Sequence, residues 1–263
     1  MSVAGMFKEK LIPGDLKTLY HRIRKTISPY SYLPVRNFRL YRELTKDKDG
    51  IEIGGPSYIF NKELPIYPTI AHLDGCNFSN KTVWEGSIEE GNNYHYFKDR
   101  TGYQYICEAS DLHDVQSNKY DFLMASHCLE HCANVLKTVR EWVRVIKNKG
   151  SLLLVLPVKE NCFDHNRAVT SFDHLVNDLK SNVDETDLAH LDEILTLHDL
   201  SMDPQAGTKE QFIKRSEDNF HNRCLHHHVF DIGLLKKIYS YFNISVLDTA
   251  STPYHHIILG VKK

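Results

Sequence analysis

Short apolar runs alternate with segments of helical periodicity along most of the chain. The segment 134–146 carries its apolar residues on one helical face, and 231–242 repeats that pattern. The run "SLLLVLP" at 151–157 is apolar throughout, which is typical of a strand in the buried middle of a parallel sheet. Seven strands are predicted, at 50–53, 69–73, 103–107, 120–125, 151–157, 244–250 and 255–263. Strands that alternate with helices predict an open α/β sheet.

Two segments depart from this alternation. Residues 1–45 are basic and carry Leu16, Leu19 and Ile23 at helical spacing, which predicts a helical N-terminal extension before a domain at 46–263. Its basic face is either solvated or in contact with an acidic substrate or a membrane surface. The segment at about 160–225 is polar and rich in His, Asp and Glu, with helical patterns, and predicts a helical insertion on the acceptor side of the domain.

Composition narrows the class of protein. The 263 residues are 41% hydrophobic and 25% charged, as in ordinary globular proteins, and a net charge of −2 argues against a general nucleic-acid binder. No run of 18 apolar residues predicts a membrane span, and the first residues lack the apolar stretch of a signal peptide. The six cysteines show no framework spacing. Reduced thiols, a cytoplasmic location and at most peripheral membrane contact are therefore expected. The oligomeric state stays open.

Histidine is unusually frequent. The chain has sixteen, and twelve of them follow residue 126. Histidine titrates near neutral pH, binds metals and transfers protons. The enrichment predicts a polar site in the second half of the chain.

The stretch "IEIGGPS" at 51–57 predicts a buried strand that ends in a glycine turn, where backbone N–H groups can approach a ligand. Asp74 follows Gly54 by 20 residues, the spacing at which a carboxylate commonly binds ribose hydroxyls. The set G-x-G-x-x-G is missing, which argues against NAD. Glu52 favours a cationic ligand. S-adenosylmethionine is cationic and carries no phosphate.

Several motifs together resemble one family. These are "IEIGGPS", "HLDG", "CEASDL", the block "YDFLMASHCLEHCANVLKTVREWVRVIKNKGSLLLVLP" and the closing "HHHVFD" with its helix and two strands. From residue 50 onward the chain resembles class I S-adenosylmethionine-dependent methyltransferases of the type 11 kind. It looks closest to those encoded among bacterial surface-polysaccharide genes. The resemblance implies a Rossmann-like fold, with a seven-stranded, mostly parallel sheet flanked by helices and a helical insertion after strand five.

The resemblance also implies a set of cofactor-binding residues. Asp74 is expected to hold the ribose hydroxyls, and Asp111 is expected to meet the adenine amine. The full set is Glu52, Gly54, Gly55, Pro56, Ser57, Asp74, Glu108, Ala109, Asp111, Leu112, Ser126 and His127.

Acceptor-side candidates lie near the predicted carboxyl ends of strands four and five and in the histidine-rich segment. A general base for a hydroxyl acceptor is sought among His127, His131, Asp164 and His165, and acceptor binding among Trp84, Arg167, His226 and His228. Each is also open to a purely structural interpretation, as a packed or solvated polar residue. A divalent metal is the other route to an activated hydroxyl, but no ligand set in the sequence supports one.

The predicted function is transfer of a methyl group from S-adenosylmethionine, as an O-methylation of a sugar in a glycan or nucleotide-sugar precursor of polysaccharide biosynthesis. The reaction class depends on the motifs, whereas the glycan acceptor depends on the resemblance. Two alternatives stay open: another small-molecule acceptor such as a natural product, and a non-catalytic relative that serves as a partner subunit.

Overall fold

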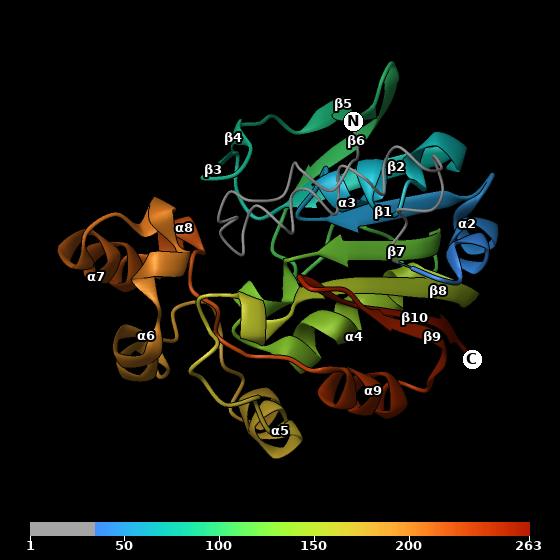
Figure 1. Cartoon of the computed structure of the whole chain (residues 1–263). Helices are drawn as coiled ribbons and strands as arrows, with labels where there is room; N and C mark the ends of the chain where they lie inside the picture. Colours follow the sequence, from blue (N-terminus) through green and yellow to red (C-terminus); the bar gives the residue numbers. More distant parts are fainter. Residues whose placement is uncertain (1–34) are drawn as a thin grey trace, which may run out of the picture. The chain divides into compact units, whose positions relative to one another are not determined.

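The computed structural model describes residues 35–263 (Figure 1). Most of the predicted N-terminal extension lies outside the described residues. Its last part forms helix α2 (Phe38–Thr45), whose Tyr41 is fully buried. No described helix has the length and apolar character needed to cross a membrane.

The described residues are built around one eight-stranded sheet in the order β5-β6-β2-β1-β7-β8-β10-β9 (Figure 1). Its parallel strands are β1 (Asp49–Ile53), β2 (His72–Asn77), β6 (Arg100–Ile106), β7 (Tyr120–Ser126) and β8 (Ile146–Pro157). Three strands run antiparallel to a neighbour: β5 (Gly91–Phe97), β9 (Ile244–Ser251) and β10 (His255–Lys262). This confirms the predicted Rossmann-like sheet, and β5 is an addition to the seven strands expected.

The added strand replaces a helix. Between β2 and β6 the chain forms a small hairpin, β3 (Lys81–Thr82) and β4 (Gly86–Ser87), and then β5. The alternating pattern of "GNNYHYF" explains this choice, because it buries Tyr94 and Tyr96 against the sheet and exposes His95 between them.

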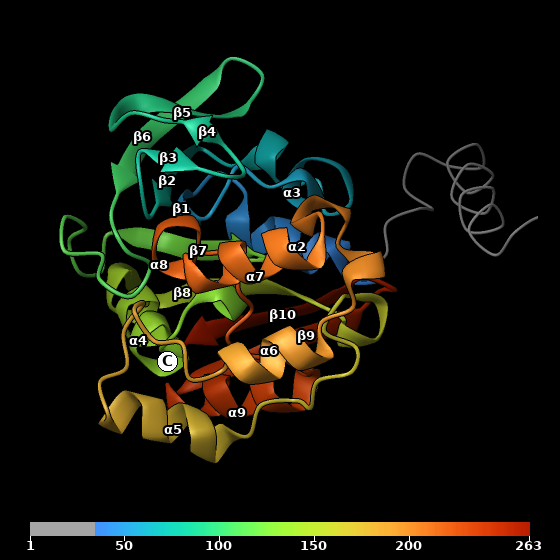
Figure 2. The ribbon, with the colours of Figure 1, turned by 90° about the vertical axis from the view of Figure 1, so that its left-hand side faces the viewer.

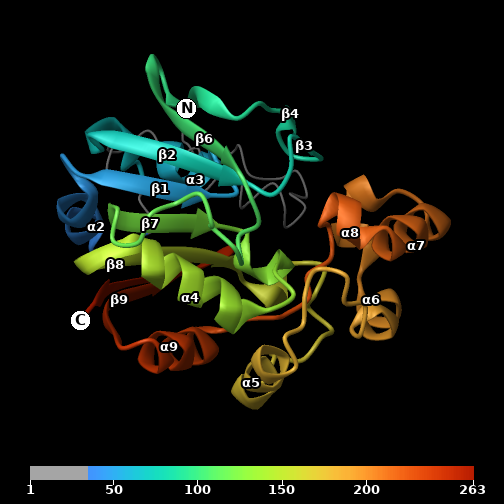
Figure 3. The ribbon, with the colours of Figure 1, turned by 180° about the vertical axis from the view of Figure 1, so that it is seen from behind.

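Helices cover both faces of the sheet. On one face lie α4 (Val135–Val145), α5 (Phe172–Lys180) and α9 (Ile232–Tyr241), whose buried side chains include Trp142 and Leu235 (Figure 3). On the other face α2 and α3 (Tyr58–Lys62) share a second apolar cluster with β5. The central strands are thereby buried on both faces, which explains their unbroken apolar sequences.

Strand β2 differs from its prediction. The residues expected to begin it, 69–71, belong to the end of a 3-10 turn, η2 (Tyr67–Thr69), and the following connection, and the strand continues through Asn77. Asp74 therefore lies in the middle of β2, paired with Ile51 of β1. A carboxylate is tolerated there because Tyr120 Oη, the Tyr103 N–H and Lys119 Nζ bond to it, at 2.5, 2.8 and 3.1 Å.

The predicted insertion separates β8 from α9 and lies beyond the carboxyl ends of the parallel strands (Figures 1 and 2). Besides α5 it contains η4 (Lys159–Asn161), α6 (Leu191–Leu197), η5 (Leu200–Met202), η6 (Pro204–Ala206), α7 (Lys209–Glu217) and α8 (Asn219–Asn222). It has a small core of its own around Ile194 and Phe212. Within residues 184–200 of this segment, α6 is the one α-helix that the structure describes, and η5 begins at Leu200.

We expect Asp74→Ala to lower the free energy of unfolding by about 2–3 kcal/mol, because its four hydrogen-bond partners, Tyr103, Lys119, Tyr120 and His72, lose the carboxylate. Urea denaturation near pH 7 measures the loss, and Asp49→Ala, an exposed residue on the neighbouring strand, is the matched control. Burial raises the pKa of Asp74, but its hydrogen bonds outweigh burial and lower the pKa overall. The difference between wild type and variant is therefore present above the unfolded carboxyl pKa of about 3.9 and shrinks as the pH falls through the lower folded value. Equal stability of the two variants would contradict this role.

Candidate active site

A cavity of about 630 Å³ opens where the carboxyl ends of the parallel strands meet the insertion, and its size is typical of small-molecule sites. The sheet side is formed by Ile53, Gly54, Pro56, Ser57, Asn77, Phe78, Glu108, Ala109, Ser126 and His127. The insertion side includes Met202, Asp203, Gln205, Arg215, Arg223, Cys224 and His226. One space thus joins residues that are far apart in the sequence.

The turn after β1 needs both of its glycines, for different reasons. Gly54 has φ +75°, a left-handed conformation that favours glycine. A Cβ on Gly55 would lie 2.3 Å from the Glu52 carboxyl carbon and 2.4 Å from Tyr94 Oη. Gly54 faces the cavity with Pro56 and Ser57, whereas Gly55 packs away from it.

Glu52 does not line the cavity, contrary to its predicted contact with the cofactor. It is fully buried and accepts hydrogen bonds from Tyr67 Oη and Tyr94 Oη, both at 2.6 Å, and from the Ser57 N–H at 3.0 Å. Burial raises its pKa, and these hydrogen bonds offset part of the rise. Its role in this structure is to hold the turn.

Asp74 also lies outside the cavity, so the predicted ribose carboxylate is misplaced. The end of β2 presents Asn77 and Phe78 instead, and Asn77 Nδ2 donates to the Gly55 carbonyl at 3.2 Å. The predicted strand, 69–73, ends four residues before the observed end of β2 at Asn77. The hairpin after β2 supplies a different carboxylate to the cavity, Glu85, whose pKa is raised by burial.

At the end of β6, Glu108 and Ala109 line the cavity. The other two residues predicted in this loop do not: Asp111 is exposed and Leu112 is buried in the core. Glu108 is paired with Arg223, a residue that the sequence analysis missed. The Arg223 guanidinium also lies over the Phe78 ring, 5.2 Å from its centroid, and so contributes to the wall between the β2 and β6 ends.

The segment after β7 places His127 and His131 at the cavity. It forms a single 3-10 turn, η3 (Leu129–His131), rather than the helix considered from the sequence. His127 has φ +51°, and its Nε2 lies 2.9 Å from Nδ1 of His255. Burial, with His255 and His226 nearby, lowers the pKa of His127 to about 3.

His131 has a defined tautomer. Its Nδ1 donates to the Leu225 carbonyl at 3.1 Å, which leaves a lone pair on Nε2. Burial lowers its pKa well below the ordinary histidine value. Trp84, predicted to contact the acceptor, lines the cavity, is 52% exposed and packs edge-on against the His131 ring with centroids 5.3 Å apart.

His226 lines the cavity and is paired through Nδ1 with Asp164, which is buried behind it. Burial lowers the pKa of His226, but the Asp164 carboxylate outweighs burial and raises it to about 10. The pKa of Asp164 is lowered to about 2, because His226 and Arg167 outweigh its burial. The pair is therefore an imidazolium and a carboxylate at neutral pH.

Three other predicted residues lie away from the cavity. Arg167 is only 2% exposed and bonds Asp164 and the carbonyls of residues 226 and 227, so it supports the insertion and does not reach an acceptor. His165 pairs with Asp199 at 2.9 Å, and His228 is buried near α5. These polar side chains are close to site residues in the sequence, but in the structure they contact other parts of the protein. No sequence pattern reveals the direction in which they point.

Glu130, buried behind the cavity, forms with the lining residues His131 and His226 a set that has the donors for a cation. Suitable atoms of Glu130, His131 and His226 all lie within 4.8 Å of one another, and neither carboxylate oxygen of Glu130 has a hydrogen-bond partner. Burial raises the pKa of Glu130 to about 7. Metal binding there would have to displace the proton on His226.

All six cysteines line the same cavity as free thiols: Cys76, Cys107, Cys128, Cys132, Cys162 and Cys224. The sequence showed only scattered positions. The fold gathers them because most follow, or lie at, the ends of parallel strands.

The strand order, the cavity at the strand ends and the insertion after β8 define the Rossmann-like fold of class I methyltransferases. Residues 70–154, from the start of β2 into β8, match the methyltransferase domain family. S-adenosylmethionine is the cofactor of that class of domain. No curated protein matches the sequence.

Three solved structures are similar to this chain. The chain is similar to one in the complex between the Haloferax volcanii Trm112 methyltransferase activator and a putative methyltransferase, with 9% identity, coverage of 93% of this chain and 94% of that chain, and a TM-score of 0.50. An S-adenosylmethionine-dependent methyltransferase from Mesorhizobium loti has 9% identity, coverage of 86% and 96%, and a TM-score of 0.48. The methyltransferase CalH in complex with SAH has 11% identity, coverage of 96% and 61%, and a TM-score of 0.46. At these identities the likeness is one of fold.

We expect the His226 ring to stay protonated between about pH 5 and 8 in the wild type, and to lose its proton in Asp164→Asn, because burial then acts without the carboxylate. Histidine-selective NMR across this range measures both states. Asp199→Asn, which removes the partner of His165 instead, should leave the His226 signal unchanged. The raised folded pKa also means that the pair stabilises the protein fully below the unfolded value of about 6.5, and that this contribution is lost as the pH rises through about 10. A wild-type His226 midpoint near 6.5 would refute the assignment.

Proposed function

We propose that this chain transfers a methyl group from S-adenosylmethionine to an acceptor held between the sheet edge and the insertion. The observation that carries the proposal is the single cavity that touches the ends of β1, β2, β6 and β7 on one side and His131 and His226 on the other.

The sheet side of the cavity fits the cofactor. Phe78 and Ala109 flank a space between two strand ends that suits a flat base, and the left-handed Gly54 lets backbone approach the ligand. The carboxylate of Glu85 suits a ligand that is cationic and carries no phosphate, whereas the carboxylate of Glu108 is already paired with Arg223. The bound cofactor would supply an electrophilic methyl group on its sulfonium.

The acceptor that we propose is a sugar hydroxyl in a glycan or nucleotide-sugar precursor of polysaccharide biosynthesis, made in the cytoplasm. Trp84 offers a partly exposed ring of the kind on which sugars stack. Gln205 and the ion pair between Arg215 and Asp203, at 2.7 Å, offer polar contacts on the insertion side. The six free thiols agree with a reducing compartment.

His131 is the residue that we propose for the acceptor proton. Its Nε2 lone pair is available, and the Leu225 carbonyl holds the ring in that tautomer. A weak base is sufficient, because an alkylated hydroxyl is far more acidic than the free hydroxyl. Most of the catalysis would come from holding the acceptor in line with the methyl group.

A divalent cation at Glu130, His131 and His226 is a second route to the same reaction. The unpartnered Glu130 oxygens favour it, since buried carboxylates without partners are rare. A bound cation would lower the pKa of the acceptor hydroxyl. Activity that survives EDTA favours the histidine route, and activity that is lost and then restored by a divalent metal favours the cation.

We expect S-adenosylhomocysteine to raise the unfolding temperature, with about 2.7 kcal/mol of added stability at a hundredfold excess over its dissociation constant. Phe78→Ala should weaken the ligand by roughly tenfold, because the base loses an aromatic contact. Asp74→Asn should keep wild-type affinity despite a lower starting stability. Differential scanning fluorimetry and calorimetric titration measure both effects.

The opposite pattern, in which Asp74→Asn abolishes binding and Phe78→Ala does not, would overturn the placement of the cofactor. No shift for the wild type at millimolar ligand would favour the non-catalytic relative. A shift with NAD instead would indicate that the cavity binds a dinucleotide.

We expect His131→Gln to lower kcat by about 10²–10⁴ while the affinity for S-adenosylhomocysteine stays close to that of the wild type. The assay measures S-adenosylhomocysteine release with a panel of nucleoside-diphosphate sugars. His165→Gln is the matched control, since His165 lies outside the cavity, and it should keep wild-type turnover. A His131→Gln enzyme with unchanged kcat would remove His131 as the base.

A further inference from the structure

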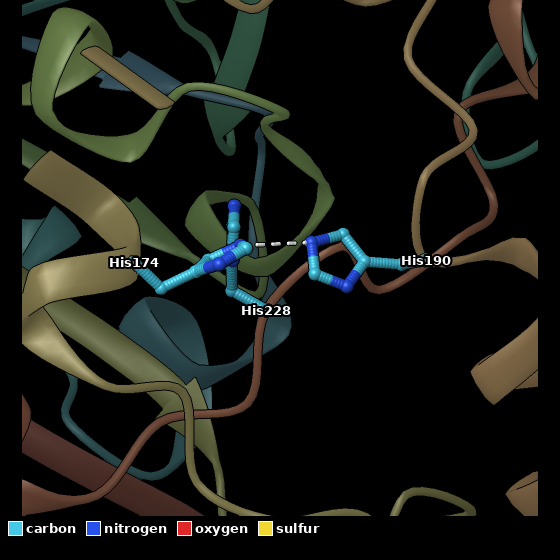
Figure 4. Close-up of side chains that lie close together, drawn as sticks. All are labelled: His174, His190 and His228. Carbon is cyan, nitrogen blue, oxygen red and sulfur yellow. Dashed lines mark hydrogen bonds between the residues drawn. The ribbon is translucent and has the colours of Figure 1, made fainter. Parts of the chain in front are cut away.

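Three histidines and an aspartate that the proposed reaction does not use come together at the base of the insertion. His174 and Asp178 lie one turn apart on α5, His190 immediately precedes α6, and His228 lies in the segment that leads to α9. Figure 4 shows the rings of His174 and His190 facing one another, with His228 beside His174. None of these side chains lines the cavity described above.

The spacing of the side chains fits a small metal ion. His174 Nε2 lies 3.0 Å from His190 Nε2 and 3.3 Å from Asp178 Oδ2. Suitable nitrogen atoms of the three histidines all lie within 4.8 Å of one another. Ligands at about 2.0–2.1 Å around a tetrahedral zinc ion are separated by roughly 3.3 Å. The separation between His174 and His190 is a little shorter than that value, and the separation between His174 and Asp178 equals it.

Hydrogen bonds leave two atoms of this cluster without a partner. Asp178 Oδ2 and His228 Nδ1 are buried and have no hydrogen-bond partner. His228 is only 1% exposed, so water does not replace the missing partner at its surface. Buried polar atoms without partners cost about 1–3 kcal/mol each, and a cation among them would remove that cost.

The hydrogen bond of His228 selects the tautomer that a metal ligand requires. His228 Nε2 donates to the Ala133 carbonyl at 3.1 Å, so its lone pair is on the unpartnered Nδ1. A histidine ligand commonly donates its other ring nitrogen to a carbonyl in this way. The spacing of His174 and Asp178 on α5, at i and i+4, puts both on one face of the helix.

We propose that His174, Asp178, His190 and His228 bind a structural zinc ion. The three histidines form the set of mutually close ligand atoms, and Asp178, 3.3 Å from His174 Nε2, is the proposed fourth ligand. Four protein ligands would leave no open position, which distinguishes a structural from a catalytic zinc. The ion would join α5, the start of α6 and the segment before α9. It would thereby fix the chain that carries His226 to the cavity. The proposal does not depend on the proposed function.

The test uses the full chain without an affinity tag of histidines. Elemental analysis of the wild type should give about one zinc per chain at this site. His190→Ala and Asp178→Asn should each weaken zinc by more than about tenfold. His221→Ala is the matched control, because His221 is exposed on α8 and pairs only with Asp218, and it should keep the zinc. His226→Ala should also keep it, which separates this site from Glu130, His131 and His226.

Two further measurements do not depend on the variants folding. A strong chelator should lower the unfolding temperature of the wild type, and stoichiometric zinc should restore it. Cobalt added to the zinc-free wild type should give the intense visible absorption of a tetrahedral site. A zinc-free protein whose unfolding temperature does not respond to added zinc, or zinc retained by both His190→Ala and Asp178→Asn, would overturn the proposal. Binding of S-adenosylhomocysteine is measured separately, so the zinc site and the proposed function are tested independently of each other.

Discussion

The buried guanidinium of Arg167 is the contact on which the arrangement of the site depends. Its Nη1 donates to Asp164 Oδ1 at 3.0 Å and to the His226 carbonyl at 2.7 Å, and its Nη2 donates to the His227 carbonyl at 3.1 Å. A buried charge is tolerated only when it is paired and hydrogen-bonded, so these partners are held together by the cost of separating them. The loop after β8 and the distant histidine segment are thereby joined. Asp164 uses its other oxygen to orient His226 toward the cavity.

A second buried carboxylate shapes the opposite wall. Glu52 gathers Tyr67, Tyr94 and the Ser57 N–H, and these contacts hold the turn that carries Gly54 to the cavity. The added strand β5 has a part in this, because it supplies Tyr94. An edge strand that replaces a helix therefore contributes directly to the shape of the site. The cavity therefore lies between two walls, and a buried acidic residue stabilises each of them.

Elements with a local sequence signal were predicted correctly. Polar side chains with several possible neighbours were not. The periodicity of α4 and the apolar run of β8 gave the centre of the sheet, and the glycine turn gave one edge of the cavity. Asp74 was misplaced because an acidic residue marks the end of a strand only when no donor in the sheet can bind it. In this sheet Tyr120 donates a hydrogen bond to Asp74. Arg167 and His228 were expected at the acceptor, but the structure buries both. Spacing along the chain predicts that polar residues are near the site, but it does not predict the direction in which their side chains point.

By itself the sequence determined the class of fold, the strand ends that form the site and the histidine-rich segment opposite them, because these depend on periodicity and on residue types in short stretches. Only the tertiary structure decided which polar residues serve the cavity and which serve packing. Arg223 reaches Glu108 across 115 positions of the chain, and His131 and His226 meet across 95. Such contacts are chosen by the burial of charge in a closed core, where each buried group must find a partner. No local pattern encodes that choice.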